Sequence, residues 1–388
     1  MNHNHWEPSA DARCPCAQRP TGLWMRWCRY SGIASWTDCV LALLLGLACG
    51  GAGAGPFAYI TNMNSSTVSV IDTATNAVVG APITLSGGPY GVAINRTGTR
   101  VYITLGFGAV SVIDTATNTV IGSPIPVGSL PTGVAVNPAG TRVYVTNQSS
   151  DSVSVIDTST NTVVVAAIPV GNTPLGVAIN PAGTRVYVAN ALSNNLSVID
   201  TSTNTVVGAP IAVGSTPYGV AFNPAGTRLY VTNLTSGTVS VIDTANDTVV
   251  GAPIPVGFEP IGVAVTPDGA RVYVANAGTV SVIDAAAGAA IGSPIAVGTG
   301  AVGIAVTPDG SRVYVASQVS NTVSVIDTTT NTVVGTIGVG LSPSAFGQFI
   351  GPAAVNASAS PIPSLDVYEV ALLTSILGAV GMVCARRR

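Results

Sequence analysis

The feature that most constrains this chain is a repeat with a period of about 42 residues. A tetrapeptide that begins with tyrosine, typified by YVTN, occurs seven times, and so does the motif SVID. Successive copies of either motif lie 41 to 43 residues apart. Self-similarity at a fixed period of this length is the sequence signature of a repeat architecture.

Each unit reads as four short strands. In the unit that contains Gly133, the segments GVAVN, TRVYVTN, SVSVIDT and NTVVVAAIPV are rich in valine, and clusters of Gly, Pro and Asn separate them. Such segments predict strands, and a four-stranded unit of this length is typical of a propeller blade. The sequence therefore predicts an all-β fold over residues 55–350: a seven-bladed β-propeller of four-stranded antiparallel blades.

The two ends of the repeat region predict how the ring closes. The first unit begins at Phe57 with its second strand, and an unmatched segment, residues 342–350, follows the last complete unit. Because a closed ring leaves no unpaired blade edge, we expect this C-terminal strand to pair with the first blade.

The motifs YVTN, SVIDT-x-TNTVV and GVAVNPAGTRVYVTN resemble the bacterial and archaeal YVTN-type β-propeller repeats over all seven units. The resemblance implies the propeller fold. It does not select one function, because members of that family include surface proteins, and related propellers include cofactor-dependent and lactone-hydrolysing enzymes.

The N-terminal residues 1–54 read as a leader. Arg26 and Arg29 precede an apolar stretch over residues 40–48, and the Ala-Gly-Ala sequence at 52–54 follows it. This order predicts a secretory signal peptide, with Met25 as the expected start. Cys49 leaves open an alternative in which the exported chain carries a lipid at that residue.

The C-terminal part divides into a small-residue linker, 351–361, and a sorting or transmembrane tail, 362–388. The tail combines the motif Ile362, Pro363, Ser364 and Leu365 with a short apolar run and the final residues Arg386, Arg387 and Arg388. It resembles the bacterial IPTL-CTERM sorting tail. The resemblance implies contact with the membrane before processing, and recognition by an exosortase-type enzyme.

Composition excludes several kinds of chemistry from the repeat region. Residues 57–350 contain no Cys, His, Trp or Lys, so Ser-His-Asp, Cys-His and Schiff-base arrangements are excluded there. The usual protein ligands of zinc, haem and copper are also missing there, and we expect neither a cofactor nor a metal. A net charge of −3 without a basic block argues against nucleic acid as a partner.

The repeated aspartate of SVID predicts a turn rather than a ring of catalytic carboxylates, because it follows a strand in every unit. An arginine precedes each tyrosine strand except the first. These arginines could hold the neighbouring turn or pair with the repeated aspartate. Carboxylate chemistry therefore depends on the acids outside the pattern, which are Asp151, Asp247 and Glu259.

Two classes of loop vary between units: those joining the second and third strands, and those joining one blade to the next. In a four-stranded blade both classes fall on the same face, which we call the variable face. Exposed side chains on such loops are natural contact residues, although neutral drift would produce the same variation. The candidate binding residues are Tyr90, Phe107, Asp151, Leu175, Tyr218, Phe258 and Glu259.

Together these observations predict an exported protein of the bacterial envelope, cell surface or extracellular space. The expected function is a non-catalytic binding or structural module that contacts an envelope or extracellular protein or polysaccharide through the variable face. The alternative is a propeller hydrolase of the lactonase kind that uses carboxylates or a metal on that face. Convergence of two of the acids Asp151, Asp247 and Glu259 with Arg96 in one pocket at the channel mouth would favour the hydrolase, and scattered positions would favour binding.

Overall fold

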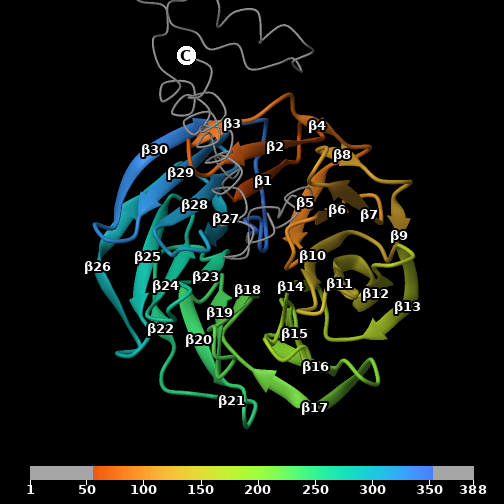
Figure 1. Ribbon diagram of the computed structural model, residues 1–388. Helices are drawn as coiled ribbons and strands as arrows, with labels where there is room; N and C mark the ends of the chain where they lie inside the picture. Colours follow the sequence, from red (N-terminus) through yellow and green to blue (C-terminus); the bar gives the residue numbers. More distant parts are fainter. Residues whose placement is uncertain (1–55, 353–388) are drawn as a thin grey trace, which may run out of the picture. The chain divides into compact units, whose positions relative to one another are not determined.

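The computed structural model describes residues 56–352, which form seven antiparallel sheets arranged around a central axis (Figure 1). The predicted all-β seven-bladed propeller is confirmed. Inner strands lie next to the axis, and each blade except the first is built outward from its inner strand in sequence order.

The strands of the first three blades are β1 (Phe57–Asn62), β2 (Thr67–Asp72), β3 (Ala77–Val78) and β4 (Ile83–Thr84); β5 (Pro89–Ile94), β6 (Arg100–Leu105), β7 (Ala109–Asp114), β8 (Thr119–Val120) and β9 (Ile125–Pro126); and β10 (Pro131–Val136), β11 (Arg142–Asn147), β12 (Ser152–Asp157) and β13 (Thr162–Pro169), with a short 3-10 helix, η1 (Gln148–Ser150), between β11 and β12.

The strands of the last four blades are β14 (Pro174–Ile179), β15 (Arg185–Asn190), β16 (Asn195–Asp200) and β17 (Thr205–Ala212); β18 (Pro217–Phe222), β19 (Arg228–Asn233), β20 (Thr238–Asp243), β21 (Thr248–Val249) and β22 (Ile254–Pro255); β23 (Val263–Val265), β24 (Arg271–Ala275), β25 (Thr279–Asp284) and β26 (Ala289–Ala296); and β27 (Ala301–Val306), β28 (Arg312–Ser317), β29 (Thr322–Asp327) and β30 (Thr332–Gly338).

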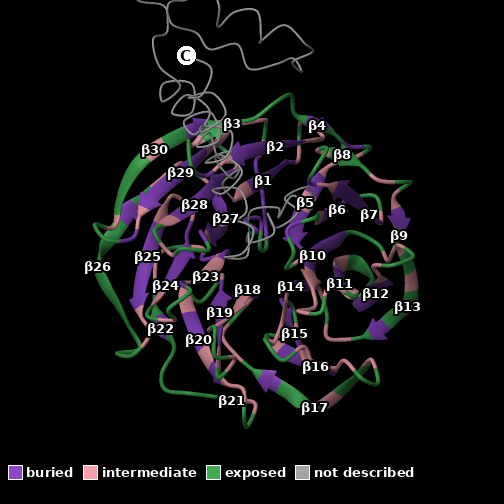
Figure 2. Cartoon of the chain, viewed as in Figure 1, coloured by how far each residue is buried: buried purple, intermediate pink, exposed green. Residues whose placement is uncertain are grey.

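The core lies between blades rather than within one. A cluster that is typical of the ring joins Tyr144 and Val155 of the third blade to Val186 and Ile199 of the fourth. Strands on the outer rim are more exposed, as Figure 2 shows for β13, β17 and β26, because no further strand covers them. The low charge of the chain follows from this stacking of buried, valine-rich strands.

The repeated tyrosine forms the polar contact between blades. Its hydroxyl donates to the side chain of the residue that ends the turn between the third and fourth strands of the next blade. We call this contact the Tyr–Asn clasp, and within the described residues it joins five of the seven blade pairs: Tyr59 with Asn118, Tyr144 with Asn204, Tyr187 with Asp247, Tyr273 with Asn331, and Tyr314 with Asn76.

The inner strands approach one another closely around the axis. A Cβ atom added to Gly176 would lie 2.1 Å from the carbonyl oxygen of Tyr218 in the next blade. Glycine at this point of the repeat therefore allows the inner strands to form a narrow ring.

Residues 342–350, which we call the closing segment, complete the first blade as predicted. The amide of Tyr59 donates to the carbonyl of Phe349 at 2.9 Å, and the amide of Ser344 donates to Thr61 at 2.8 Å. The segment also reaches the second blade, where the amide of Val92 donates to Phe346 at 2.9 Å. It therefore joins the first blade to the second.

Candidate site in the central channel

The loops that vary between units share one face of the ring. The amide of Gln148, between β11 and β12, donates to Leu130 in the loop that enters the same blade, at 3.0 Å. Ala191 and Thr173 make the equivalent contact at 2.9 Å in the fourth blade. The nearly identical turns lie at the other ends of the strands, on the face that we call the repeated-turn face.

The seven candidate binding residues separate into two groups. Phe107 and Phe258 project from the variable face with exposed fractions of 57% and 76%. Asp151 and Glu259 lie on loops of that face, both with a positive φ. Leu175 is buried, and is therefore unavailable as a surface contact.

Tyr90 and Tyr218 form the second group and cross the channel from opposite sides. Their hydroxyl oxygens are 2.5 Å apart in a hydrogen bond. The ring of Phe346 lies 5.8 Å from the ring of Tyr90 and 5.2 Å from that of Tyr218. Burial raises the pKa of both tyrosines, so both stay protonated. These three rings, the aromatic plug, close the channel toward the variable face.

The acids outside the repeated pattern do not converge. The carboxylate of Asp151 accepts the backbone amide of Thr173 at 2.7 Å on the variable face. Asp247 occupies a repeated turn on the opposite face and accepts the hydroxyl of Tyr187 in a Tyr–Asn clasp. Glu259 lies on a third loop. None of these acids lines the cavity that Arg96 borders, so the carboxylate arrangement considered for a hydrolase is not formed.

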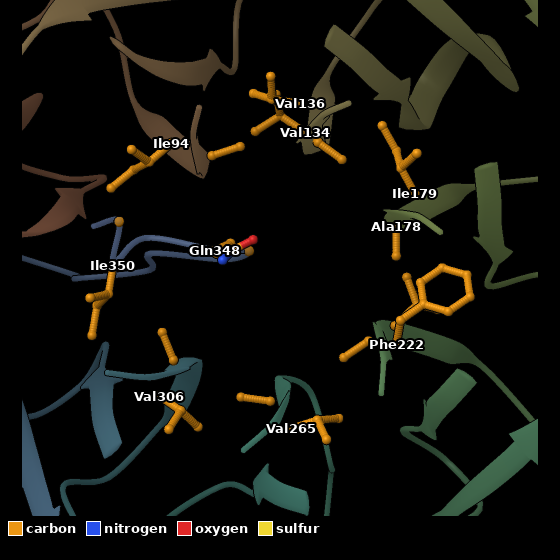
Figure 3. A pocket seen from close by; sticks show the side chains of 18 of the residues that line it. Ile94, Val134, Val136, Ala178, Ile179, Phe222, Val265, Val306, Gln348 and Ile350 are labelled. Carbon is orange, nitrogen blue, oxygen red and sulfur yellow. The ribbon is translucent and has the colours of Figure 1, made fainter. Parts of the chain in front are cut away.

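That cavity has a volume of about 670 Å³ and occupies the channel between the plug and the repeated-turn face. Figure 3 shows aliphatic side chains from several blades around its opening, with the amide of Gln348 toward the middle. At the rim lie Asn95, Arg96 and Asn137. Arg96 is the one charged side chain among the described residues of the lining, and it is exposed.

Gln348 reaches the cavity because the closing segment carries extra residues. Two bridges pair the closing segment with β1, Asn62–Pro343 and Ala58–Ile350. Between them the chain advances by four residues along β1 but by seven residues along the closing segment. In the third blade, four steps along β11 match only five along β10. The two additional residues bulge inward, where Phe346 joins the plug and Gln348 enters the cavity.

The departures from the repeat therefore gather at one cavity. Arg96 stands where the third blade has Pro138, and Phe222 stands where it has Val136. Gln348 and Phe346 come from the bulge. Sequence reasoning placed Arg96 near a possible pocket but missed the other three. Aligning the closing segment with the inner strands, residue by residue, would have revealed the two additional residues.

The repeated polar residues have structural roles. In all seven units the aspartate of SVID accepts the backbone amide two residues later, as Asp157 does from Ser159 at 2.9 Å. Arg142 pairs with Asp157, whereas Arg100 donates to the carbonyl of Thr158 in the next blade at 3.2 Å. Both arrangements considered for the repeated arginines therefore occur.

Within residues 56–352, no cluster of three His, Cys, Asp or Glu side chains could hold a metal ion. In the same part of the chain, no helix is both long and apolar enough to cross a membrane. The expected leader, most of the linker and the sorting tail lie outside the described residues.

The fold and its cavity define a seven-bladed propeller with a candidate binding site in its channel. Residues 53–207, less than half of the chain, match the family described as "Lactonase, 7-bladed beta-propeller". None of the curated proteins matches the chain.

Solved structures share the fold. Hydrazine synthase of Kuenenia stuttgartiensis is 24% identical, with a TM-score of 0.61 over 71% of this chain and 96% of that one. A candidate 6-phosphogluconolactonase of Bacteroides uniformis is 18% identical, with a TM-score of 0.64 over 75% of this chain and 98% of that one. Another, from Bacteroides fragilis, is 18% identical, with a TM-score of 0.63 over 76% and 98%.

The match to the lactonase propeller family favours the lactonase-like alternative, so the prediction of a non-catalytic envelope module was wrong. That prediction relied on the absence of His, Cys and Lys from the repeat region. Their absence excludes common covalent nucleophiles, but the hydrolysis of an ester ring can use water as its nucleophile, without a covalent intermediate. The composition therefore excluded fewer reactions than the sequence argument assumed.

Proposed function

We propose that this protein hydrolyses a lactone bound in the central cavity. The observation that carries the proposal is the meeting of Arg96, Phe222 and Gln348, each a departure from the repeat, at one opening. In a sevenfold repeat, a position shared by all blades serves the fold, whereas a reaction site requires distinct groups. The match to the lactonase propeller family supports the same reaction class.

In this reaction water adds to the ring carbonyl, and negative charge develops on the carbonyl oxygen. The ring C–O bond then breaks, the ring oxygen takes up a proton, and the product is a hydroxy acid. Arg96 and Gln348 offer N–H donors that can stabilise the developing charge. Among residues 56–352, the only ion pairs are Arg142–Asp157 and Arg228–Asp243, so no carboxylate there competes for Arg96.

The described lining contains no carboxylate, His, Cys or Lys that could act as a general base. We therefore expect the rate of the protein-dependent reaction to rise with pH as hydroxide becomes available, rather than to follow a bell-shaped profile. The measurement is ring opening across a panel of lactones that includes 6-phosphogluconolactone, with the protein-free rate subtracted at each pH.

Two variants test the assignment. Removing one donor to a developing oxyanion reduces the rate by about 10²–10³-fold in known enzymes, so Arg96→Ala and Gln348→Ala should each cause a large loss. Arg185→Ala is the matched control, because Arg185 lies on the repeated-turn side but not in the cavity lining. Equal rates in Arg96→Ala and Arg185→Ala, or no rate above background with any lactone, would contradict the proposal.

We also propose that the chain is exported to the cell envelope or surface. The signal-peptide pattern supports export, and the IPTL-CTERM-like tail supports membrane contact followed by exosortase-type processing. The YVTN-type repeats and the exposed Phe107 and Phe258 support a contact with an envelope or extracellular protein or polysaccharide. Mass spectrometry of both termini, in secreted and membrane fractions, tests export and processing.

A further inference from the structure

We infer that the ligand of the central cavity is a lactone whose ring carries an unbranched apolar chain, with the chain directed toward the aromatic plug. This inference rests on the proposed function and specifies its substrate class. It separates this chain from a hydrolase of phosphorylated sugar lactones, whose substrates carry hydroxyl and phosphate groups around the ring.

The walls of the cavity carry the first part of the argument. Val136, Ile179, Phe222, Val265 and Val306 come from successive blades and end the inner strands at the opening of the cavity. Each packs partly against the core between two blades and is half-buried, so part of its surface stays uncovered. Their apolar surface therefore borders the open volume. An aliphatic chain would remove this surface from water, which strengthens binding by about fourfold for each methylene.

The positions of the polar side chains carry the second part. Asn95, Arg96 and Asn137 lie at the rim, next to the turns, and Gln348 projects inward from the bulge. The aliphatic walls between rim and plug offer no side-chain partner for sugar hydroxyls, and an unpaired buried hydroxyl weakens binding. The lactone carbonyl therefore belongs near the rim, and the apolar part of the ligand belongs deeper.

The aromatic plug sets the depth. Phe346 lines the cavity, while Tyr90 and Tyr218 lie behind it and bind each other through their hydroxyls. Because neither tyrosine lines the cavity and Phe346 does, the plug presents an apolar end to the cavity. A chain that reaches Phe346 cannot extend further, and longer chains should bring no additional affinity.

Calorimetry with lactam analogues, in which N–H replaces the ring oxygen and prevents hydrolysis, tests the inference. The analogues differ only in the length of an unbranched alkyl chain. Affinity should rise about fourfold per methylene and then reach a plateau. Phe346→Ala should move the plateau to longer chains, whereas Phe258→Ala, on the variable face, should leave it unchanged.

A second variant tests the inference independently, in case Phe346→Ala does not fold. Val306→Thr keeps the side-chain shape but makes the wall polar, so it should reduce the gain per methylene, and Val319→Thr on the variable face is its matched control. Melting temperatures close to that of the parent protein establish that each variant is folded. Affinity that is independent of chain length in the parent protein would overturn the inference.

The outcomes separate this inference from the proposed function. Lactams that bind with the expected dependence, while the matching lactones stay intact, would contradict the proposed function and support the ligand class. Preferential hydrolysis of 6-phosphogluconolactone, together with a lactam affinity that does not depend on chain length, would support the proposed function and overturn the ligand class.

Discussion

The aspartate that ends each third strand connects a single side chain to the stability of the ring. Hydrogen bonds from the hydroxyl and the backbone amide of Ser159 lower the pKa of Asp157 to about 2. Similar contacts lower the pKa of Asp200 and Asp327, and Arg228 has this effect on Asp243. In each case the folded protein favours the charged carboxylate.

These shifts predict acid sensitivity. A folded-state pKa below the ordinary value of 3.8 adds stability above about pH 4, and this stability is lost as the pH falls toward 2. The melting temperature should therefore decrease between pH 4 and about 2. In Asp157→Asn the decrease should be smaller, because the amide cannot be protonated in this range. Identical pH profiles for parent and variant would show that Asp157 does not contribute.

Residue roles could be predicted from the sequence where the partner is local. The turn role of Asp157 follows from its place after a strand, and the structure agrees. The hydroxyl partner of Tyr144 could not be found in this way, because Asn204 lies 60 positions further along the chain and in another blade. Asp247 was considered as a possible catalytic acid for the same reason: its partner, Tyr187, belongs to the preceding blade.

At the scale of the strand and its turn, two of the seven blade contacts among the described residues lack a clasp, those of Tyr102 and Tyr230, and the second also lacks the acceptor side chain. Gly288 occupies the position that Asn331 has in the next blade, and it has a positive φ of 62°. Tyr230, the tyrosine of the preceding blade, lines with Gly288 a cavity of about 750 Å³ between the fifth and sixth blades. The turn after Asp284 thus offers the hydroxyl of Tyr230 no acceptor side chain at this position.

Restoring the side chain should stabilise this contact. Asparagine tolerates a positive φ, and a Cβ atom at residue 288 meets no atom within 4 Å. Gly288→Asn should therefore let Tyr230 form a clasp and raise the free energy of unfolding by about 1 kcal/mol, measured by denaturant titration.

Gly292→Asn is the control for this change, since Gly292 has a similar φ of 67° and open surroundings, but the repeat places no tyrosine partner there. Adding Tyr230→Phe should remove the gain of Gly288→Asn. A gain of the same size without the tyrosine hydroxyl would show that a clasp is not its cause.

The candidate site was less predictable than the strands around it. Valine-rich segments and turn residues predict each blade, because strand formation depends on local pattern. The cavity depends on where the ring closes. Phe346 and Gln348 face the channel only because the closing segment bulges against β1, and the inner strands of the other blades contain no bulge of that length.

At the scale of the whole molecule, stability depends on closure. The closing segment hydrogen-bonds to the first blade through Tyr59 and to the second through Val92, and Phe349 and Ile350 are buried in a core cluster that also includes residues of the last blade. Removing it would leave the inner edge of β1 unpaired and expose an apolar surface at once.

Two truncations test this dependence. Ending the chain before residue 342 should greatly lower the melting temperature or prevent folding, whereas ending it after residue 352 should change the melting temperature little. Calorimetry measures both. Equal melting temperatures for the two truncated proteins would contradict the role of closure.

The position of the bulge also affects the order of events during synthesis. Domains generally begin to fold from the N-terminal side while translation continues. Six complete blades can leave the ribosome before residues 342–350 do, yet Phe346 and Gln348 reside on that last strand. Until that segment emerges, a nascent chain therefore has neither a closed ring nor a finished cavity, and it acquires both in one step.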